Sequence, residues 1–498
     1  MRILLTVFIF SFFGAVFIGC DGGGSGGGGF VPTGDILAVA ERAGQNQTIK
    51  VGGTEGSVPP GSTVEVTNLD TAETQTTVGL PDGSFDPTFT GSTDDVFNVL
   101  VTNNGNIVLD TVVGVTLLRN AVQRNLAQLG SVPADIKIRG SRAYVINGFS
   151  NNIQVFELNQ NPPLLLMTIV VPPGSNPISM DFFGDTQAYV ANNTGQSVAV
   201  VNIQNGDCET LIVSAEDEGI TIPCENVINV PADTFEEPAG VKVVGDKVYI
   251  SNNNLDENFS PNGNGFISVF TAGTNQLLGT IEASGSNTTS MVEIDEILYA
   301  LNNGNILFDL ETGEFTCDFD FPPSIDIINT GTDTVIDTID IPLSEQNSTI
   351  CLPNNLTATS DGFGYTGLGL VGALLKVDLF EGTVINGPGN PIVITDLTGL
   401  NNTADIAIKD NLLFTTLFNS DQIAVLDTNT DQVDPFPYIT PFPAGIRADN
   451  PNSDLFDGVQ SLAIRPGEPG IDFTGADIYF ITGISEQLGS VDSTLQTQ

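Results

Sequence analysis

Histidine and tryptophan are both absent from this 498-residue chain. Without histidine there is no Ser-His or Cys-His nucleophile pair, no imidazole metal site, and no side chain of the kind that most often moves protons in enzymes. A haem-based redox role is also disfavoured, because the sequence has neither a histidine ligand nor a haem-attachment motif. The composition therefore leaves carboxylate chemistry as the main catalytic option.

Basic residues are scarce as well. Lysine and arginine number 14 against 60 aspartates and glutamates, which gives a formal net charge of −46 at pH 7. No basic patch is available to hold a phosphate backbone, so nucleic-acid binding is excluded. The acidity favours divalent cations over anionic partners, and it is equally the composition of a solvated surface adapted to high salt.

Long apolar runs are missing except at the N-terminus. Arg2 precedes residues 3–18, which are apolar at all but three positions, and Gly19-Cys20 follows. This layout is typical of a secretory signal and is too short to be a comfortable transmembrane helix. It resembles a bacterial lipoprotein signal, in which a small residue precedes a cysteine that is lipidated, although Phe17 stands where leucine is usual. The alternative is an ordinary signal peptide with an incidental cysteine.

The lipoprotein resemblance implies a signal peptide at residues 1–19 and a lipid on Cys20. Residues 21–29 are nearly all glycine, so we expect residues 20–35 to form a lipidated, flexible tether. The implied location is the bacterial cell envelope, at the outer membrane or cell surface, with the membrane as a partner through the lipid. The sequence leaves open whether the protein faces the periplasm or the outside.

Four cysteines remain after Cys20, an even number that suits an oxidising compartment. Three pairings are open in principle. We predict Cys208–Cys224 and Cys317–Cys351, because each local pair would fasten an irregular insertion without joining distant repeats. No CxxC spacing occurs, which argues against a zinc site.

Residues 36–117 contain short alternating runs separated by turn signals, such as Pro-Asp-Gly at 81–83. This spacing predicts a small antiparallel sandwich. Residues 56–66 and 82–85 resemble bacterial immunoglobulin-like domains of surface proteins, which implies a spacer role. A polar, helix-compatible linker is expected at residues 118–130.

A repeat fills the rest of the chain. Each unit reads as a strand, a turn, a second strand with an aromatic residue near its start, a turn and a third strand. The seven first strands begin near residues 134, 178, 240, 291, 356, 404 and 459. Units of this length and strand density are typical of β-propeller blades. The fold class is therefore all-β, a seven-bladed β-propeller at residues 131–490, with six or eight blades as alternatives and a tail at 491–498.

The last unit is short of a fourth strand. We expect a strand near residues 112–118, or one near residues 126–132, to close the ring. Residues 188–193 and 197–201, Ala-Tyr-Val-Ala-Asn-Asn and Ser-Val-Ala-Val-Val, resemble the repeats of YVTN-type surface-layer propellers, and residues 248–253 and 422–427 match in part. That resemblance implies the propeller and says little about activity.

A candidate site lies where the innermost strands begin, because these ends surround the central channel. Oxygen-bearing side chains precede or open each first strand: Asp135, Asn176, Glu237, Ser290, Asn355, Asp405 and Asp457. We take Asp135, Glu237, Asn355, Asp405 and Asp457 as candidate ligands of a cation, calcium above all, or of a small polar molecule. The alternative is that these residues cap strand starts and meet only water.

Two functions stay open. The first is a non-enzymatic surface protein whose propeller face binds a protein or a glycan, as the long loops at 207–238 and 316–351 favour. The second is a lactonase-like hydrolase, in which a channel-bound calcium polarises a carbonyl and a carboxylate manages protons. No catalytic motif is visible, so the first function is the stronger expectation.

Overall fold

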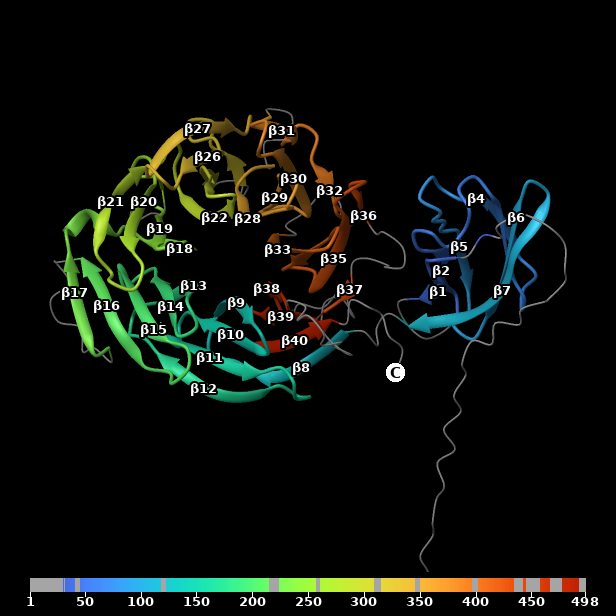
Figure 1. Ribbon diagram of the computed structural model, residues 1–498, viewed down its shortest axis with the longest axis horizontal. Helices are drawn as coiled ribbons and strands as arrows, with labels where there is room; N and C mark the ends of the chain where they lie inside the picture. Colours follow the sequence, from blue (N-terminus) through green and yellow to red (C-terminus); the bar gives the residue numbers. More distant parts are fainter. Residues whose placement is uncertain are drawn as a thin grey trace, which may run out of the picture.

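The computed structural model describes residues 30, 32–40, 45–117, 122–214, 224–256, 260–308, 315–344, 350–395, 402–433, 442–444, 457–465 and 477–491. The predicted signal peptide, Cys20 and most of the tether lie outside these ranges. Figure 1 shows two parts, a ring of β-sheets and a smaller β-unit beside it. Within the described ranges, no helix is long and apolar enough to cross a membrane.

The smaller unit has seven strands in the order β4-β3-β6-β7-β1-β2-β5. Their bounds are β1 (Ile36–Ala40), β2 (Gln47–Gly53), β3 (Thr63–Asn68), β4 (Thr74–Val78), β5 (Thr88–Gly91), β6 (Val96–Asn103) and β7 (Asn106–Leu117). The long β7 pairs antiparallel with β6 and, near its end, parallel with β1. Alternating side chains of the strands on both sides of β7 fill one buried core, which includes Val51, Val66, Phe89 and Phe97.

The larger part is a seven-bladed β-propeller, because the described residues after 121 form seven main sheets arranged around an axis (Figure 1). Blade 1 consists of β9 (Pro133–Arg139), β10 (Arg142–Asn147), β11 (Asn152–Glu157) and β12 (Leu164–Val170). Blade 2 consists of β13 (Pro177–Phe183), β14 (Gln187–Asn192), β15 (Ser197–Asn202), β16 (Cys208–Ser214) and β17 (Asn226–Val230). Blade 3 consists of β18 (Pro238–Val244), β19 (Lys247–Asn252), β20 (Phe266–Thr271) and β21 (Leu277–Glu282). A short 3-10 helix, η2 (Ala232–Thr234), connects blades 2 and 3.

Blade 4 consists of β22 (Thr288–Ile294), β23 (Ile297–Asn302), β26 (Ser324–Asn329) and β27 (Thr334–Asp340), and the hairpin of β24 (Ile306–Phe308) and β25 (Phe315–Cys317) is inserted in it. Blade 5 consists of β28 (Pro353–Ala358), β29 (Phe363–Leu368), β30 (Ala373–Asp378), β31 (Thr383–Asn386) and β32 (Ile392–Val393). Blade 6 consists of β33 (Thr403–Lys409), β34 (Leu412–Leu417), β35 (Gln422–Asp427), β36 (Gln432–Val433) and β37 (Phe442–Pro443).

Blade 7 closes the ring. It combines β38 (Val459–Ile464), β39 (Ile478–Thr482) and β40 (Gln487–Val491) with β8 (Val122–Gln128), which comes from before blade 1. Ala127 pairs with Leu488, and the Leu129 amide donates to the Glu486 carbonyl over 2.9 Å. The linker prediction is therefore wrong for residues 122–128. Their polar sequence suggests a loop or helix locally, but pairing with the unfilled edge of β40 makes them a strand. The closing strand expected near residues 126–132 is present a few residues earlier, as β8, whereas the alternative at residues 112–118 belongs to β7 of the smaller unit.

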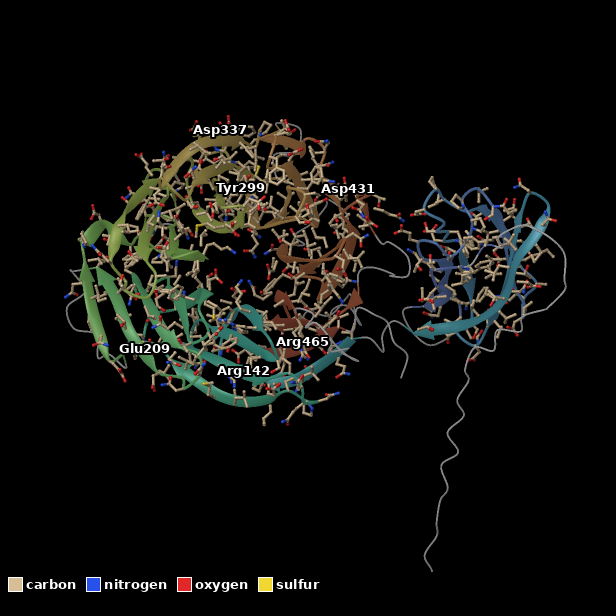
Figure 2. The ribbon with its side chains drawn as sticks, in the orientation of Figure 1. Arg142, Glu209, Tyr299, Asp337, Asp431 and Arg465 are labelled. Carbon is tan, nitrogen blue, oxygen red and sulfur yellow. A yellow bond between two sulfur atoms is a disulfide. The ribbon has the colours of Figure 1, made fainter. Side chains whose placement is uncertain are left out.

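Neighbouring blades are joined by tyrosines of the second strands. The Tyr249 hydroxyl lies 2.7 Å from Asp333 Oδ1 in the next blade, and the Tyr365 hydroxyl lies 3.1 Å from Asp431 Oδ1. Lys376 also pairs over 2.7 Å with Asp431, which is labelled in Figure 2. The aromatic position that marks the repeats thus packs in the interior, and in blades 2, 3 and 5 its tyrosine hydroxyl also makes a polar contact to the next blade.

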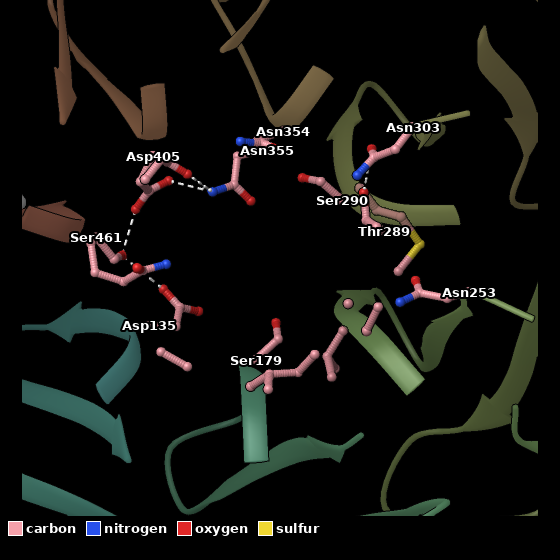
Figure 3. Close-up of a pocket in the computed structure, with 18 of the residues that line it drawn as sticks. Asp135, Ser179, Asn253, Thr289, Ser290, Asn303, Asn354, Asn355, Asp405 and Ser461 are labelled. Carbon is pink, nitrogen blue, oxygen red and sulfur yellow. Dashed lines mark hydrogen bonds between the residues drawn. The ribbon is translucent and has the colours of Figure 1, made fainter. Parts of the chain in front are cut away.

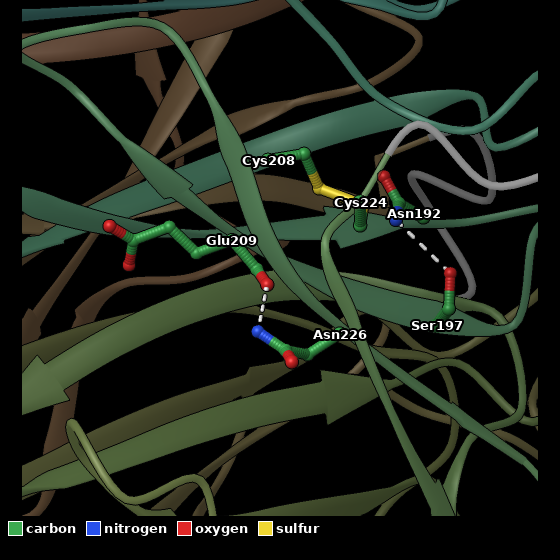
Figure 4. The surroundings of a disulfide bond; sticks show 6 residues. All are labelled: Asn192, Ser197, Cys208, Glu209, Cys224 and Asn226. Atoms are coloured by element: carbon green, nitrogen blue, oxygen red, sulfur yellow. Dashed lines mark hydrogen bonds between the residues drawn. A yellow bond between two sulfur atoms is a disulfide. The ribbon is translucent and has the colours of Figure 1, made fainter.

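Both predicted disulfides are confirmed. Cys208–Cys224 holds β17 parallel to β16 as a fifth strand of blade 2, and the Asn226 side-chain amide donates to the Glu209 carbonyl over 3.0 Å beside it (Figure 4). Cys317–Cys351 ties the inserted hairpin of blade 4 to the segment that precedes blade 5. Each bond fastens an irregular addition to the regular repeats.

Candidate functional site

A cavity of about 460 Å³ lies at the centre of the propeller (Figure 3). The third residue of every inner strand lines it. In chain order these seven ring residues are Asp135, Ser179, Gly240, Ser290, Asn355, Asp405 and Ser461. The ring is therefore built from one equivalent position of each blade.

A β-bulge explains why the third residue of the inner strand lines the cavity in every blade. In all seven blades, the pairing of the first and second strands shifts register at or next to the ring residue. A bulge adds one residue to one strand, bends it and redirects a side chain. At Gly240 a Cβ atom would stand 2.1 Å from the Thr289 carbonyl oxygen, so the backbone of the next blade occupies the space that a side chain would need.

One side of the cavity, the carboxylate wall, consists of Asp135, Lys137, Asp405 and Ser461 from blades 1, 6 and 7. The Ser461 hydroxyl lies between two carboxylates: it contacts Asp405 Oδ2 and is 3.3 Å from Asp135 Oδ1. The second oxygen of Asp405 accepts a hydrogen bond from the Asn355 amide over 2.9 Å. Three blades are thus held together at this wall by contacts around Asp405.

Burial and the neighbouring Asp135 carboxylate raise the pKa of Asp405, while Lys137 and the hydrogen bonds from Ser461 and the Leu462 amide lower it. The net result is a pKa of about 6. Burial alone would lower the pKa of Lys137, but the Asp135 and Asp405 carboxylates outweigh burial and raise that pKa. Lys137 Nζ is 3.0 Å from Asp135 Oδ2. The wall therefore combines an ion pair with a carboxylate that titrates close to neutral pH.

The opposite side, the amide wall, consists of Asn253, Thr289, Ser290 and Asn303, whereas Asn354 lies beside Asn355 and donates to Asn402 Oδ1 over 3.1 Å (Figure 3). Thr289 donates to Asn303 Oδ1 over 2.8 Å, and Ser290 Oγ accepts from the Leu356 amide over 2.9 Å. Asn253 Oδ1 is buried and has no hydrogen-bond partner among the described residues. This wall is uncharged, and none of the described residues that line the cavity is aromatic.

The structure brings three of the five candidate ligands to the cavity, namely Asp135, Asn355 and Asp405, and it also places Ser290 there. Glu237 and Asp457 do not line it, and neither does Asn176. Glu237 immediately precedes β18, where burial raises its pKa and Glu236 and Asp256 raise it further. Residues before the strand enter the loops between blades, and the inward position comes three residues into the strand.

Ser461, Lys137 and Asn253 also line the cavity and are not among the residues predicted from the sequence. Aligning the third residue of each first strand would have found Ser461. Lys137 lies two residues beyond Asp135 in β9. Because alternate side chains of a strand point to the same face, this spacing would have identified Lys137 as a second lining residue. Asn253 follows a second strand, and its role depends on a loop that the repeat pattern does not define.

The described residues contain no group of three or more Asp, Glu or Cys side chains placed to hold a metal ion. At the cavity, the hypothesis of a bound cation rests on two carboxylates and an amide, and Asp135 already pairs with Lys137. Neutral hydrogen-bonding groups form most of the remaining lining. The arrangement is thus better suited to a polar organic ligand than to a bare cation.

No family model matches the chain, and no curated protein is significantly similar to it in sequence. Solved structures do resemble it. Hydrazine synthase from Kuenenia stuttgartiensis matches with a TM-score of 0.52 and 14% identity, over 74% of this chain and 97% of that chain. Virginiamycin B lyase from Staphylococcus aureus matches with a TM-score of 0.49 and 12% identity, over 74% of this chain and 98% of that chain. At such identities the likeness concerns the fold alone, which is that of a seven-bladed β-propeller.

Proposed function

We propose that this is an exported, lipid-anchored bacterial surface protein whose propeller is a non-enzymatic binding module for a small polar ligand at the central channel. The observation that carries this proposal is the carboxylate wall, in which Asp405, Ser461 and Asp135 from three blades meet in one cavity. Protein sites that bind small molecules are concave and contain a few precisely positioned polar groups.

The lining defines the chemical class of the ligand. A volume of about 460 Å³ suits a small molecule. The carboxylates favour hydrogen-bond donors and positive charge, and the amide wall adds neutral hydrogen-bonding side chains such as Asn253 and Asn303. Because no described lining residue is aromatic, a flat ring has no surface on which to stack. We therefore infer a non-aromatic amine or polyol.

Several observations favour binding over catalysis. Ser461 is only 3% exposed, and its hydroxyl hydrogen is engaged by carboxylates rather than presented to a substrate. Asp405 accepts from Asn355, Ser461 and the Leu462 amide, so its orientation is fixed by three hydrogen bonds. Side chains fixed in this way are well suited to hold a ligand in one orientation.

Export and anchoring are supported by the N-terminal signal, the glycine tether and the two disulfides, since disulfides persist mainly in oxidising compartments. We also propose that the seven-strand unit is an Ig-like spacer. The parallel pairing of β1 with the end of β7, together with one core shared across the sheet, supports this assignment. The resemblance of the repeats to the YVTN type supports a surface location in the same way.

Calorimetric titration with three probes tests the function: a linear diamine (putrescine), a polyol (sorbitol) and calcium chloride. We expect one of the two organic probes to bind, and Asp405→Asn to weaken its affinity by at least about tenfold. Asp337→Asn is the matched control, because it removes the same charge on the exposed outer strand β27 (Figure 2). Equal affinities in both variants, or no binding of either organic probe, would overturn the proposal.

One observation favours the hydrolase alternative. A carboxylate with a pKa near 6 can exchange protons at neutral pH, as a general base must. In that case calcium would bind at the cavity, and lactones or esters would be hydrolysed in a way that Asp405→Asn abolishes. Calcium binding without turnover, or turnover that survives the substitution, would count against this alternative.

A further inference from the structure

The outer edge of blade 1 differs in chemistry from the rest of this acidic chain. Residues 158–180 contain no charged side chain. They include β12, the outermost strand of blade 1, which among the described strands pairs only with β11. Leu164, Leu165, Leu166 and Val170 are 47%, 44%, 40% and 51% exposed. An apolar strand with an open edge is a template for pairing with another strand.

Outer strands of most other blades carry charges or are short. β12 has seven uncharged residues and a single bulge, at Leu166, whereas the uncharged outer strands β17 of blade 2 and β31 of blade 5 have only five and four residues. β27 contains Asp337 and Asp340, and β21 contains Gly279 and Glu282. The outer strand of blade 7, β8, contains Arg124, and β36 has only two residues. In blade 2 the edge of β16 is covered by β17. Charges, interruptions and short length are the usual means by which sheet edges avoid pairing.

We propose that β12 pairs antiparallel with β12 of a second copy of this chain, about a two-fold axis at Met167. This register places Leu164 opposite Val170, Leu165 opposite Ile169, and Leu166 opposite Thr168 of the second copy. Apolar cross-strand neighbours stabilise such pairs, and the open backbone N–H and C=O groups of both edges become hydrogen-bonded.

Charge selects a second copy as the occupant. A two-fold interface brings identical surfaces together, so like charges face each other. For a chain of net charge −46 most surfaces would repel, whereas β12 and its flanks bring no charge to the contact. Blade 1 as a whole, residues 133–170, has three basic and two acidic side chains. A lipid surface fits less well, because apolar surroundings would leave the backbone groups of the edge unpaired.

The expected affinity is modest. One pair of seven-residue strands buries less surface than a standard stable interface. We therefore expect a dissociation constant on the order of 10 µM. Sedimentation velocity of residues 21–498, which contain every residue that the structure describes, measures it.

Leu166→Lys tests the edge, since it places a charge within the paired strands, and we expect it to weaken dimerisation at least about tenfold. Leu278→Lys is the matched control, because Leu278 is 49% exposed on the outer strand β21. A protein that remains monomeric at concentrations about tenfold above the expected constant would overturn the proposal. A dimer that is insensitive to Leu166→Lys would do the same.

Met167→Cys tests the register. On a two-fold axis the introduced thiols of the two copies meet, and the four native cysteines of residues 21–498 are already disulfide-bonded. We expect a covalent dimer under mild oxidation, and none with Ile336→Cys, a more exposed site on β27 at which an introduced thiol is easier to oxidise than at the half-buried Met167. Absence of the covalent dimer would contradict the register. Co-sedimentation of monomers with phosphatidylethanolamine–phosphatidylglycerol vesicles, lost in Leu166→Lys, would assign β12 to a lipid surface instead and overturn self-pairing.

Discussion

The carboxylate wall and the amide wall of the cavity share one backbone arrangement and differ in the side chains placed on it. Both use a β-bulge next to the third residue of an inner strand. On the carboxylate wall this residue joins three blades through Asp405, whereas on the amide wall Ser290 makes one contact to the Leu356 amide. The repeat thus supplies equivalent backbone positions in all blades. The side chain at each position determines how much charge that part of the cavity carries and how many contacts hold neighbouring blades together.

The largest difference between the walls is expected in stability. Asp405→Ala removes the acceptor of Asn355, Ser461 and the Leu462 amide, and we expect the free energy of unfolding to fall by about 3 kcal/mol. Ser290→Ala removes the acceptor of one amide and should cost about 1 kcal/mol. Urea unfolding followed by circular dichroism measures both. Equal losses in the free energy of unfolding would mean that the two walls stabilise the propeller to the same extent.

The second prediction concerns pH. Because the pKa of Asp405 is raised to about 6, the group is protonated at pH 5 and ionised at pH 7. The affinity for putrescine should therefore rise about tenfold across this range, as the carboxylate gains its charge. Calorimetry at fixed ionic strength measures the profile. In Asp405→Asn the rise should disappear, and a rise that persists would assign the titration to another group.

The raised pKa of Asp405 also makes the stability of the ligand-free protein depend on pH, and this dependence is opposite to that of the affinity. The folded state holds the Asp405 proton more tightly than the unfolded chain, whose pKa is near the ordinary 3.8. The contribution of Asp405 to the free energy of unfolding is therefore full below pH 3.8 and is lost as the pH rises to about 6. The difference between the wild type and Asp405→Asn isolates this contribution from the other acidic residues.

Much of the fold could be predicted from the sequence, because repetition and alternation are local signals. The seven first strands, the aromatic positions and both cysteine pairs were readable in this way. A closing strand just before blade 1 was one of two expectations. The bounds of β8 and the choice between the two stayed open, since β8 lies far in sequence from its partner β40 and has a polar composition. Its identity depends on tertiary pairing, which a local pattern does not contain.

The candidate site was predictable only in part for a related reason. Asp135, Asn355 and Asp405 were found because acidic and amide residues near strand starts were sought. Glu237 and Asp457 satisfied the same criterion but lie outside the lining, because the bulge moves the inward position into the strand. A bulge is a relation between two strands, so no single run of residues reveals it.

The third prediction sharpens the electrostatics of the carboxylate wall. Lys137 lowers the pKa of Asp405 and pairs with Asp135 over 3.0 Å. Lys137→Met should therefore raise the pKa of Asp405 further above its ordinary value, because a positive charge is lost and Asp135 is left unneutralised. Carboxyl carbon chemical shifts followed by NMR across the pH range measure it. An unchanged or lower pKa would show that Lys137 does not set the charge of this wall.

The smallest change in stability is expected on the amide wall, at Asn253. Its Oδ1 is buried and has no hydrogen-bond partner among the described residues, so Asn253→Ala removes an acceptor that contributes nothing to cohesion there. We expect the free energy of unfolding to change by less than about 0.5 kcal/mol. Affinity for the organic probe that binds should nevertheless fall severalfold, because the ligand loses an amide side chain that lines the wall opposite Asp405. A clear loss of stability with unchanged affinity would instead make Asn253 a structural residue and confine recognition to the carboxylate wall.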